Sequence, residues 1–278
     1  MRAILVLYLV AGIDAANPAE SGLGMDAGNA AAIYGSYNAL VYLTPLIGGW
    51  LADRVIGARK SVLFGGIIIA LGHYSMAAPG EAMFWIGLLL IAGGTGLLKP
   101  NVSTMVGALY SGQTEARKDS AFSIFYMAIN VGAFMAPLVT GWLAIQYGWE
   151  WGFLAAGVGM TLAVIVYVIG WPTLRGAGVE APNKANKAAI RKVILGIIGI
   201  VFLIVLAVVI QGFWTGYSVS DVATIFAISV VVIAIGYVIF VYRSPLVTAN
   251  DRPRMRVFLF LCIGSVFYWM VSDQGGST

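Results

Sequence analysis

Nine apolar stretches alternate with short polar junctions along the chain. Their approximate residues are 3 to 13, 30 to 52, 61 to 78, 82 to 110, 120 to 145, 150 to 171, 192 to 213, 222 to 242 and 255 to 275. A helix needs about 20 mainly apolar residues to cross a membrane, and every stretch except the first is long enough. None shows the two-residue alternation of a membrane barrel, so the pattern predicts an all-α membrane protein.

Charged residues gather at the junctions, and their sign alternates. All Lys and Arg residues except Arg2 and Lys99 lie at every second junction: Arg54, Arg59, Lys60, Arg117, Lys118, Arg175, Lys184, Lys187, Arg191, Lys192, Arg243, Arg252, Arg254 and Arg256. The junctions between them hold acidic residues instead: Asp14, Glu20, Asp26, Glu81, Glu150 and Asp221. By the positive-inside rule the basic junctions are cytoplasmic, which predicts a multi-pass protein of the cytoplasmic membrane.

Composition agrees with a membrane protein and excludes other classes. Of the 278 residues, 60% are hydrophobic and only 10% are charged. The net charge of +4 comes from dispersed loop residues, without the basic stripe of a nucleic-acid-binding protein. Cys262, the single cysteine, leaves no disulfide possible within the chain.

The sequence contains no Walker motif, no HExxH motif and no Cys/His cluster. We therefore expect no cofactor, no metal and no ATP hydrolysis, and any solute movement must draw on a gradient. An embedded enzyme is the least favoured interpretation, because no catalytic set is apparent. His73, the single histidine, lies at the outer end of its stretch, and a structural role is favoured for it.

Three sequence motifs resemble those of known transporters. Residues 48–60 read GGWLADRVIGARK, similar to the cytoplasmic loop signature of the major facilitator superfamily, with one extra residue before Gly57. The stretches LLKPNVSTMVGALY and DSAFSIFYMAINVGAF resemble the fourth and fifth helices of the proton-dependent oligopeptide transporter family. A charged turn that only follows the positive-inside rule is the alternative for the first motif.

The resemblance covers the whole chain and implies a major facilitator fold. It assigns 1–172 to an N-terminal six-helix bundle, 173–191 to a cytoplasmic linker, 192–250 to two inserted helices and 251–278 to the start of a C-terminal bundle. The opening MRAILVLYL resembles the family's first helix just after its ExxERFxYYG motif. We therefore expect a fragment of a bacterial inner-membrane transporter, inactive without the missing C-terminal bundle. A signal peptide is the alternative for the opening stretch.

Lys99 carries a charge in the middle of an apolar stretch. Such a lysine costs about 3 kcal/mol at mid-membrane and normally faces a wet cavity or an opposite charge. Pro100 removes the next backbone donor and should bend or loosen the helix there. The alternative, a lysine that snorkels to the interface, is disfavoured because both helix ends are distant.

The resemblance implies roles for individual residues. The expected substrate-binding residues are Arg2, Tyr34, Tyr42, Lys99, Asn130 and Trp269. Lys99, Arg2 and Asp273 are expected to couple proton movement to gating, with Arg2 and Asp273 as an ion pair. The expected cytoplasmic gate consists of Asp53, Arg54, Arg59 and Lys60. A membrane-interface role is the alternative for Tyr34, and a helix-end role for Asp273.

The implied activity is proton-coupled symport of di- and tripeptides, with peptides, protons and the lipid bilayer as partners. Two alternatives remain open at this point. The chain could belong to another major facilitator carrier, for sugars, nitrate or drugs, or to a membrane scaffold that transports nothing.

Overall fold

Helices form where the apolar stretches predict them. The computed structural model describes residues 2–12, 21–216, 218–244 and 251–272. Its helical elements, in chain order, are α1 (Arg2–Val10), α2 (Ala27–Leu51), the π-helical turn η2 (Ala52–Ile56), α3 (Ala58–Ala77), α4 (Glu81–Leu109), α5 (Glu115–Tyr147), α6 (Trp149–Ile169), the 3-10 turn η3 (Trp171–Leu174), α7 (Lys187–Thr215), α8 (Val219–Tyr242) and α9 (Asp251–Ser272). Most of these helices begin a few residues before the predicted apolar stretch, because polar junction residues form the first turn.

Seven of the described helices are long and apolar enough to cross a membrane. They are α2 with η2, α3, α4, α5, α6, α7 and α8. The first predicted stretch forms the nine-residue α1, which is too short to span, as its length predicted. The ninth stretch was predicted to run to residue 275, beyond the described part of the chain.

Local sequence explains where the helices begin and end. Asp26 caps α2 by accepting a hydrogen bond from the Asn29 amide at 3.0 Å, and Asn186 caps α7 by accepting from the Ala189 amide at 2.8 Å. Gly148 separates α5 from α6 with a φ of 114°, a backbone conformation that other residues rarely adopt. These breaks divide the long apolar regions into separate helices.

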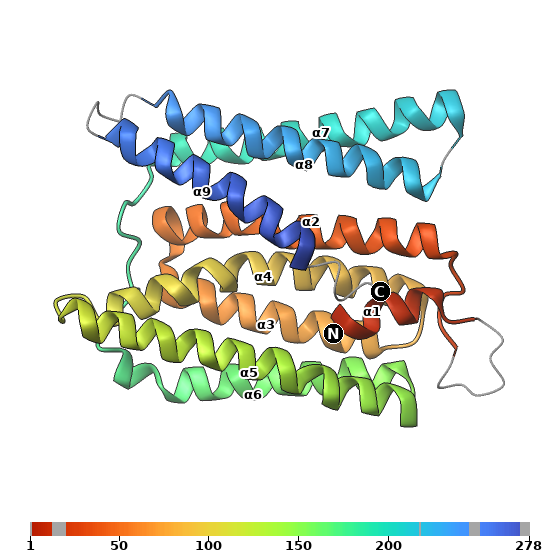
Figure 1. Ribbon diagram of the computed structural model, residues 1–278, viewed down its shortest axis with the longest axis horizontal. Helices are drawn as coiled ribbons and strands as arrows, with labels where there is room; N and C mark the ends of the chain where they lie inside the picture. Colours follow the sequence, from red (N-terminus) through yellow and green to blue (C-terminus); the bar gives the residue numbers. More distant parts are fainter. Residues whose placement is uncertain (1, 13–20, 217, 245–250, 273–278) are drawn as a thin grey trace. The chain divides into compact units, whose positions relative to one another are not determined.

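Helix α3 packs most extensively against α4 and α6, and α2 against α4 (Figure 1). Glycines allow this close packing. A Cβ at Gly65 would lie 2.7 Å from the Gly94 carbonyl oxygen, and one at Gly72 would lie 2.9 Å from that of Gly87. A Cβ at Gly93 of α4, in contrast, would meet no atom within 4 Å, so this glycine is not needed for close packing.

The chain divides into two compact units, residues 1–226 and 227–278, with the boundary inside α8. The first unit contains the main hydrophobic core, where Ile4, Leu5 and Leu9 of α1 are almost fully buried. Phe84 of α4 and Phe153 of α6 also belong to this core. The second unit consists of the rest of α8 followed by α9. The predicted division at 172, 191 and 250 stays a prediction.

Candidate functional site

The ammonium group of Lys99 lies over the aromatic ring of Tyr42. Nζ is 4.3 Å from the ring centroid, which is a cation–π contact between α4 and α2. Both side chains are exposed on the surface of the first unit. The sequence predicted a role for each residue, but it gave no sign that the two are in contact.

Lys99 lies well inside its helix. It precedes Leu109, the last residue of α4, by ten positions, which is about 15 Å at 1.5 Å per residue. Helix α4 continues through Pro100, so the proline does not break it. A long side chain this far from the helix end needs a partner at membrane depth, and Tyr42 supplies a π face.

Tyr34 and Asn130 make their described contacts elsewhere than at this pair. Tyr34 of α2 is half-buried and packs against the main core. Asn130 is exposed on α5, where its Nδ2 donates to the Tyr126 carbonyl at 2.8 Å within the same helix. Their substrate-binding roles therefore stay predictions.

Three predicted residues cannot be placed from the described structure. The side chains of Arg2 on α1 and Trp269 on α9 lie outside the described part, as does the whole of Asp273. The Arg2–Asp273 ion pair consequently stays a prediction.

The predicted cytoplasmic gate forms η2 and the start of α3. Asp53, Arg54 and Lys60 are exposed, whereas Arg59 is half-buried. The guanidinium carbon of Arg59 lies 5.8 Å from the ring centroid of Trp171, and the Tyr167 hydroxyl donates to the Arg59 carbonyl at 3.1 Å. Among the described residues, no ion pair joins members of this motif, and the recorded pair is Lys184 with Glu180.

A segment of the predicted linker folds back onto this loop. We call residues 176–185 the strap. The Arg59 amide donates to the Gly178 carbonyl at 2.8 Å, the Asn183 amide to the Asp53 carbonyl at 3.0 Å, and the Ala185 amide to the Arg54 carbonyl at 3.0 Å. Ala181 is only 6% exposed. The strap is thus packed against the loop of the predicted gate, which the polar, glycine-containing sequence did not indicate.

Packing also explains the position of His73. It is 7% exposed on α3, and its Cβ would lie 3.2 Å from a Cβ added at Gly157 of α6. The next residue, Tyr74, makes a 2.6 Å hydrogen bond with the Thr161 hydroxyl of α6. These contacts place His73 within the α3–α6 interface, as a structural role would require.

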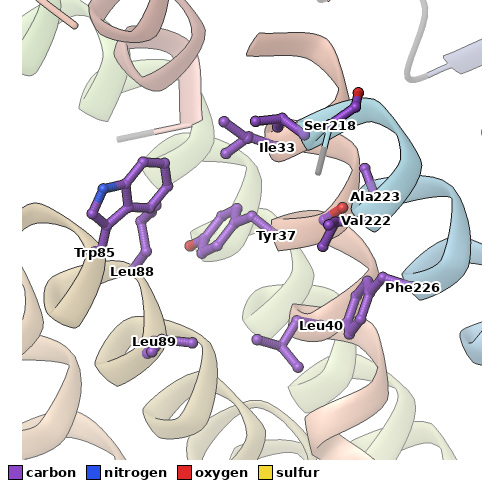
Figure 2. Close-up of a pocket in the computed structure, with 12 residues that line it drawn as sticks. Ile33, Tyr37, Leu40, Trp85, Leu88, Leu89, Ser218, Val222, Ala223 and Phe226 are labelled. Atoms are coloured by element: carbon purple, nitrogen blue, oxygen red, sulfur yellow. The ribbon is translucent and has the colours of Figure 1, made fainter. Parts of the chain in front are cut away.

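Two pockets in the described part of the chain have linings that do not include Lys99. One of about 510 Å³ has almost wholly apolar walls formed by α2, α4 and the first turns of α8 (Figure 2). The other, of about 320 Å³, is lined by aromatic residues such as Tyr8 and Trp149, together with Glu150. The described residues contain no group of three or more His, Cys, Asp or Glu that could hold a metal. Because both side chains are exposed, the Lys99–Tyr42 pair lies on the open surface of the first unit.

Comparison with known proteins gives the family. The PTR2 profile, described as the POT family, matches residues 59–278. The chain is 41% identical to the uncharacterized transporter YclF of Bacillus subtilis (strain 168), covering 100% of the chain and 55% of that protein. It is 36% identical to a di-/tripeptide transporter of Lactococcus lactis subsp. cremoris, covering 100% of the chain and 56% of that protein.

A solved structure agrees with these sequence matches. The crystal structure of a POT family transporter in complex with a thioalcohol conjugated peptide aligns with a TM-score of 0.85 and 32% identity. The alignment covers 99% of the chain and 56% of that structure. The chain thus spans about half the length of the relatives it matches, with an all-helical major facilitator fold, and it belongs to the POT family.

Proposed function

We propose that this chain is part of a symporter that carries di- and tripeptides together with protons. The observation that carries the proposal is the Lys99 ammonium, exposed in the middle of an apolar helix and resting on the ring of Tyr42. An intramembrane cation of this kind marks a substrate or ion pathway far more often than a structural position. The di-/tripeptide transporter of Lactococcus lactis, which the whole chain matches, supports the substrate class.

The chemistry of the pair suits one end of a peptide. A di- or tripeptide carries a carboxylate, an ammonium group and amide groups. Lys99 provides a positive charge for the carboxylate, and Tyr42 provides an amphipathic face for backbone or side-chain atoms. Tyr34, Asn130, Arg2 and Trp269 are proposed to complete the site in the full-length protein.

Proton coupling is proposed to act through electrostatic competition. Neutralising an acidic residue near Lys99 or Arg2 frees the cation, which then attracts the peptide carboxylate instead. Asp273 is the acidic residue of this chain that we assign to that role. One elementary charge moving down 100 mV supplies about 2.3 kcal/mol, so one proton supports considerable accumulation of a neutral peptide.

The open position of Lys99 supports a site that a second bundle completes. The chain covers about half of its relatives, so we propose that it forms the N-terminal bundle, the inserted helices and part of the C-terminal bundle of a longer transporter. Rocking of the two bundles would then expose the pair to each side of the membrane in turn. The loop at residues 53–60 would close the cytoplasmic side, in the inner membrane of a bacterium.

The test is uptake of a labelled dipeptide by the full-length protein in vesicles with an imposed proton gradient. We expect Lys99→Leu to abolish uptake, whereas Lys187→Gln, which changes an exposed lysine at the start of α7, should leave it unchanged. Uptake should also fall when a protonophore dissipates the gradient. Undiminished uptake by Lys99→Leu would overturn the assigned site, and gradient-independent uptake would overturn the coupling.

Two further measurements separate the remaining alternatives. Vesicles that contain only residues 1–278 should take up no dipeptide, because the proposed mechanism needs both bundles. Dipeptides should protect the full-length protein against thermal unfolding, whereas sugars and nitrate should not. Protection by a sugar or by nitrate would favour another major facilitator carrier, and the absence of any uptake would favour a scaffold.

A further inference from the structure

We propose that Pro100 and Asn101 are positioning residues, which build the crossing of α4 with α2 that holds Lys99 against Tyr42. The consequence for peptide transport rests on the function proposed above. The crossing itself is a property of the described residues, and it can be tested without transport.

Helices α2 and α4 touch through their backbones at Gly48 and Gly96. A Cβ at Gly48 would overlap the Gly96 carbonyl oxygen and would lie 2.9 Å from the Leu97 amide nitrogen. A Cβ at Gly96 would lie 2.6 Å from the Cβ of Thr44 and 2.8 Å from its carbonyl oxygen. The Thr44 hydroxyl also donates to the Ala92 carbonyl at 2.9 Å, across the same contact. Neither glycine can therefore accept a side chain.

Pro100 stands where it affects this contact directly. In an α-helix the amide of residue 100 would donate to the carbonyl of residue 96, but proline has no amide hydrogen. The carbonyl without that donor belongs to Gly96, the residue against which Gly48 packs. A glycine Cα–H group close to a carbonyl oxygen makes a weak hydrogen bond, and such contacts recur where helices cross. The proline thus leaves a polar acceptor facing the partner helix.

Asn101 connects the two helices on the other side of Gly48. It is 1% exposed, which makes it one of the most deeply buried polar side chains described. Its Nδ2 donates to the Leu97 carbonyl at 2.7 Å and lies 3.4 Å from the Gly48 carbonyl. An amide buried at this depth is stable only while these acceptors stay in place. Asn101 therefore ties the position of Gly48 to the backbone of α4.

The crossing is close to the functional pair on both helices. Lys99 is three residues beyond Gly96, about 5 Å along α4, and Tyr42 is six residues before Gly48, about 9 Å along α2. A shift of the crossing by a side-chain width would move the ring away from the ammonium group. In this interpretation the Lys-Pro-Asn sequence is one unit, in which lysine provides the charge and the next two residues place it.

The experiment measures the proximity of positions 42 and 99 in the full-length protein in membranes. Cysteines replace Tyr42 and Lys99 in a background where Cys262, and any further cysteine, is serine. Dibromobimane is the probe, because it becomes strongly fluorescent when it bridges two nearby thiols. We expect bridging in this background, and failure to bridge would overturn the inference.

Gly48→Ala and Gly49→Ala form a matched pair of test variants. Both place a methyl group on the same part of α2, but at Gly49 the nearest atom is the Pro100 Cβ at 3.9 Å, an ordinary contact. Bridging should fall by about fivefold or more in Gly48→Ala, a change that corresponds to about 1 kcal/mol. It should stay unchanged in Gly49→Ala. Equal bridging in both variants would contradict the proposed crossing.

Asn101→Leu keeps the volume of the side chain and removes its hydrogen bonds, so it provides an independent test if Gly48→Ala does not fold. Bridging should again fall. If Asn101→Leu bridges as well as the two-cysteine protein without this substitution, the role of Asn101 is overturned. Pro100→Ala restores the amide donor to Gly96 and should reduce bridging in the same way.

Uptake by the single variants, with Tyr42 and Lys99 intact, distinguishes this inference from the proposed function. Asn101→Leu should raise the KM for a dipeptide, while Gly49→Ala should not. If the unmodified protein carries no dipeptide but the bridging pattern is as expected, the proposed function fails and the crossing stands. If uptake is normal in every variant that has lost bridging, the positioning role fails and the proposed function stands.

Discussion

The guanidinium carbon of Arg59 lies 5.8 Å from the centre of the Trp171 ring, so the first residue of the basic pair in the loop rests on the turn that follows α6. Nε and Nη2 of Arg59 are buried and have no hydrogen-bond partner among the described residues. Among the described residues, the π face of Trp171 is therefore the main group that stabilises this buried part of the Arg59 cation. This contact ties the start of α3 to η3 at the predicted cytoplasmic end.

Substitutions of Trp171 test that contact. Trp171→Leu should destabilise the protein by about 1–2 kcal/mol, because it removes the π face from a partly desolvated cation. Trp171→Phe keeps an aromatic face and should retain most of the stability. Thermal unfolding in detergent, followed by the loss of monodisperse protein, measures both. Equal losses in the two variants would mean that side-chain volume matters rather than the π face.

Alanine at Gly57 tests whether the strap packs on the loop between α2 and α3. Gly57 has a φ of 83°, and a Cβ there would lie 2.6 Å from the Val179 carbonyl oxygen. Gly112 has a φ of 81° and no neighbour within 4 Å, so Gly112→Ala carries a similar backbone strain without the clash. We expect Gly57→Ala to be about 1–3 kcal/mol less stable than Gly112→Ala. Trypsin should also cleave the Gly57→Ala strap faster, and equal cleavage rates would speak against this packing.

Tyr42 should act mainly through its ring. In the full-length protein, Tyr42→Phe should keep most of the dipeptide affinity, because phenylalanine also offers a π face to Lys99. Tyr42→Leu should raise the KM by about 5–30-fold, which corresponds to the loss of about 1–2 kcal/mol. Initial uptake rates over a range of dipeptide concentrations measure the effect. A larger defect in Tyr42→Phe than in Tyr42→Leu would assign the role to the hydroxyl.

The hydrogen bond between Tyr74 and Thr161 should stabilise the packing of α3 on α6. The Thr161 hydroxyl donates to the Gly157 carbonyl at 2.9 Å, so Tyr74 must be the donor in its 2.6 Å contact with Thr161. A double-mutant cycle of Tyr74→Phe and Thr161→Val should give a coupling energy of about 0.5–1.5 kcal/mol. Additive effects on thermal stability would show that the contact contributes nothing measurable.

Hydropathy alone located the helices, because a membrane-spanning segment must satisfy its backbone internally and present apolar side chains. The same reasoning identified Lys99, since a charge in such a segment is rare and costly. Tyr42 was expected at the site only through the family resemblance. Its contact with Lys99 depends on how α2 crosses α4, which no local pattern specifies.

Helix pairing was harder to predict than helix position. Short loops favour antiparallel packing of sequence neighbours, and α3 with α4 and α5 with α6 pack in this way. In contrast, α2 contacts α3 only slightly, as α4 does α5. The packing of α3 on α6 and of α2 on α4 joins segments far apart in the chain. It depends on where glycines such as Gly48 and Gly96 meet in space, and glycine occurs throughout these stretches.

The strap was missed for a different reason. Its contacts with Asp53, Arg54 and Arg59 are made by backbone amides and carbonyls. Every residue has a carbonyl, and every residue except proline has an amide hydrogen, so these contacts leave no mark on the sequence. Polar and glycine-containing sequence indicates a linker just as well as a packed loop. Only the buried Ala181 distinguishes the two, and a single alanine gives no usable signal.

The strap has a mechanical consequence for the helices that follow it. Its last hydrogen bond to the α2–α3 loop is made by Ala185, and α7 begins at Lys187, so Asn186 alone separates the strap from the next helix. A connection of one residue allows almost no independent movement of the two segments that it joins. A displacement of η2 and the start of α3 would therefore also displace the first turn of α7.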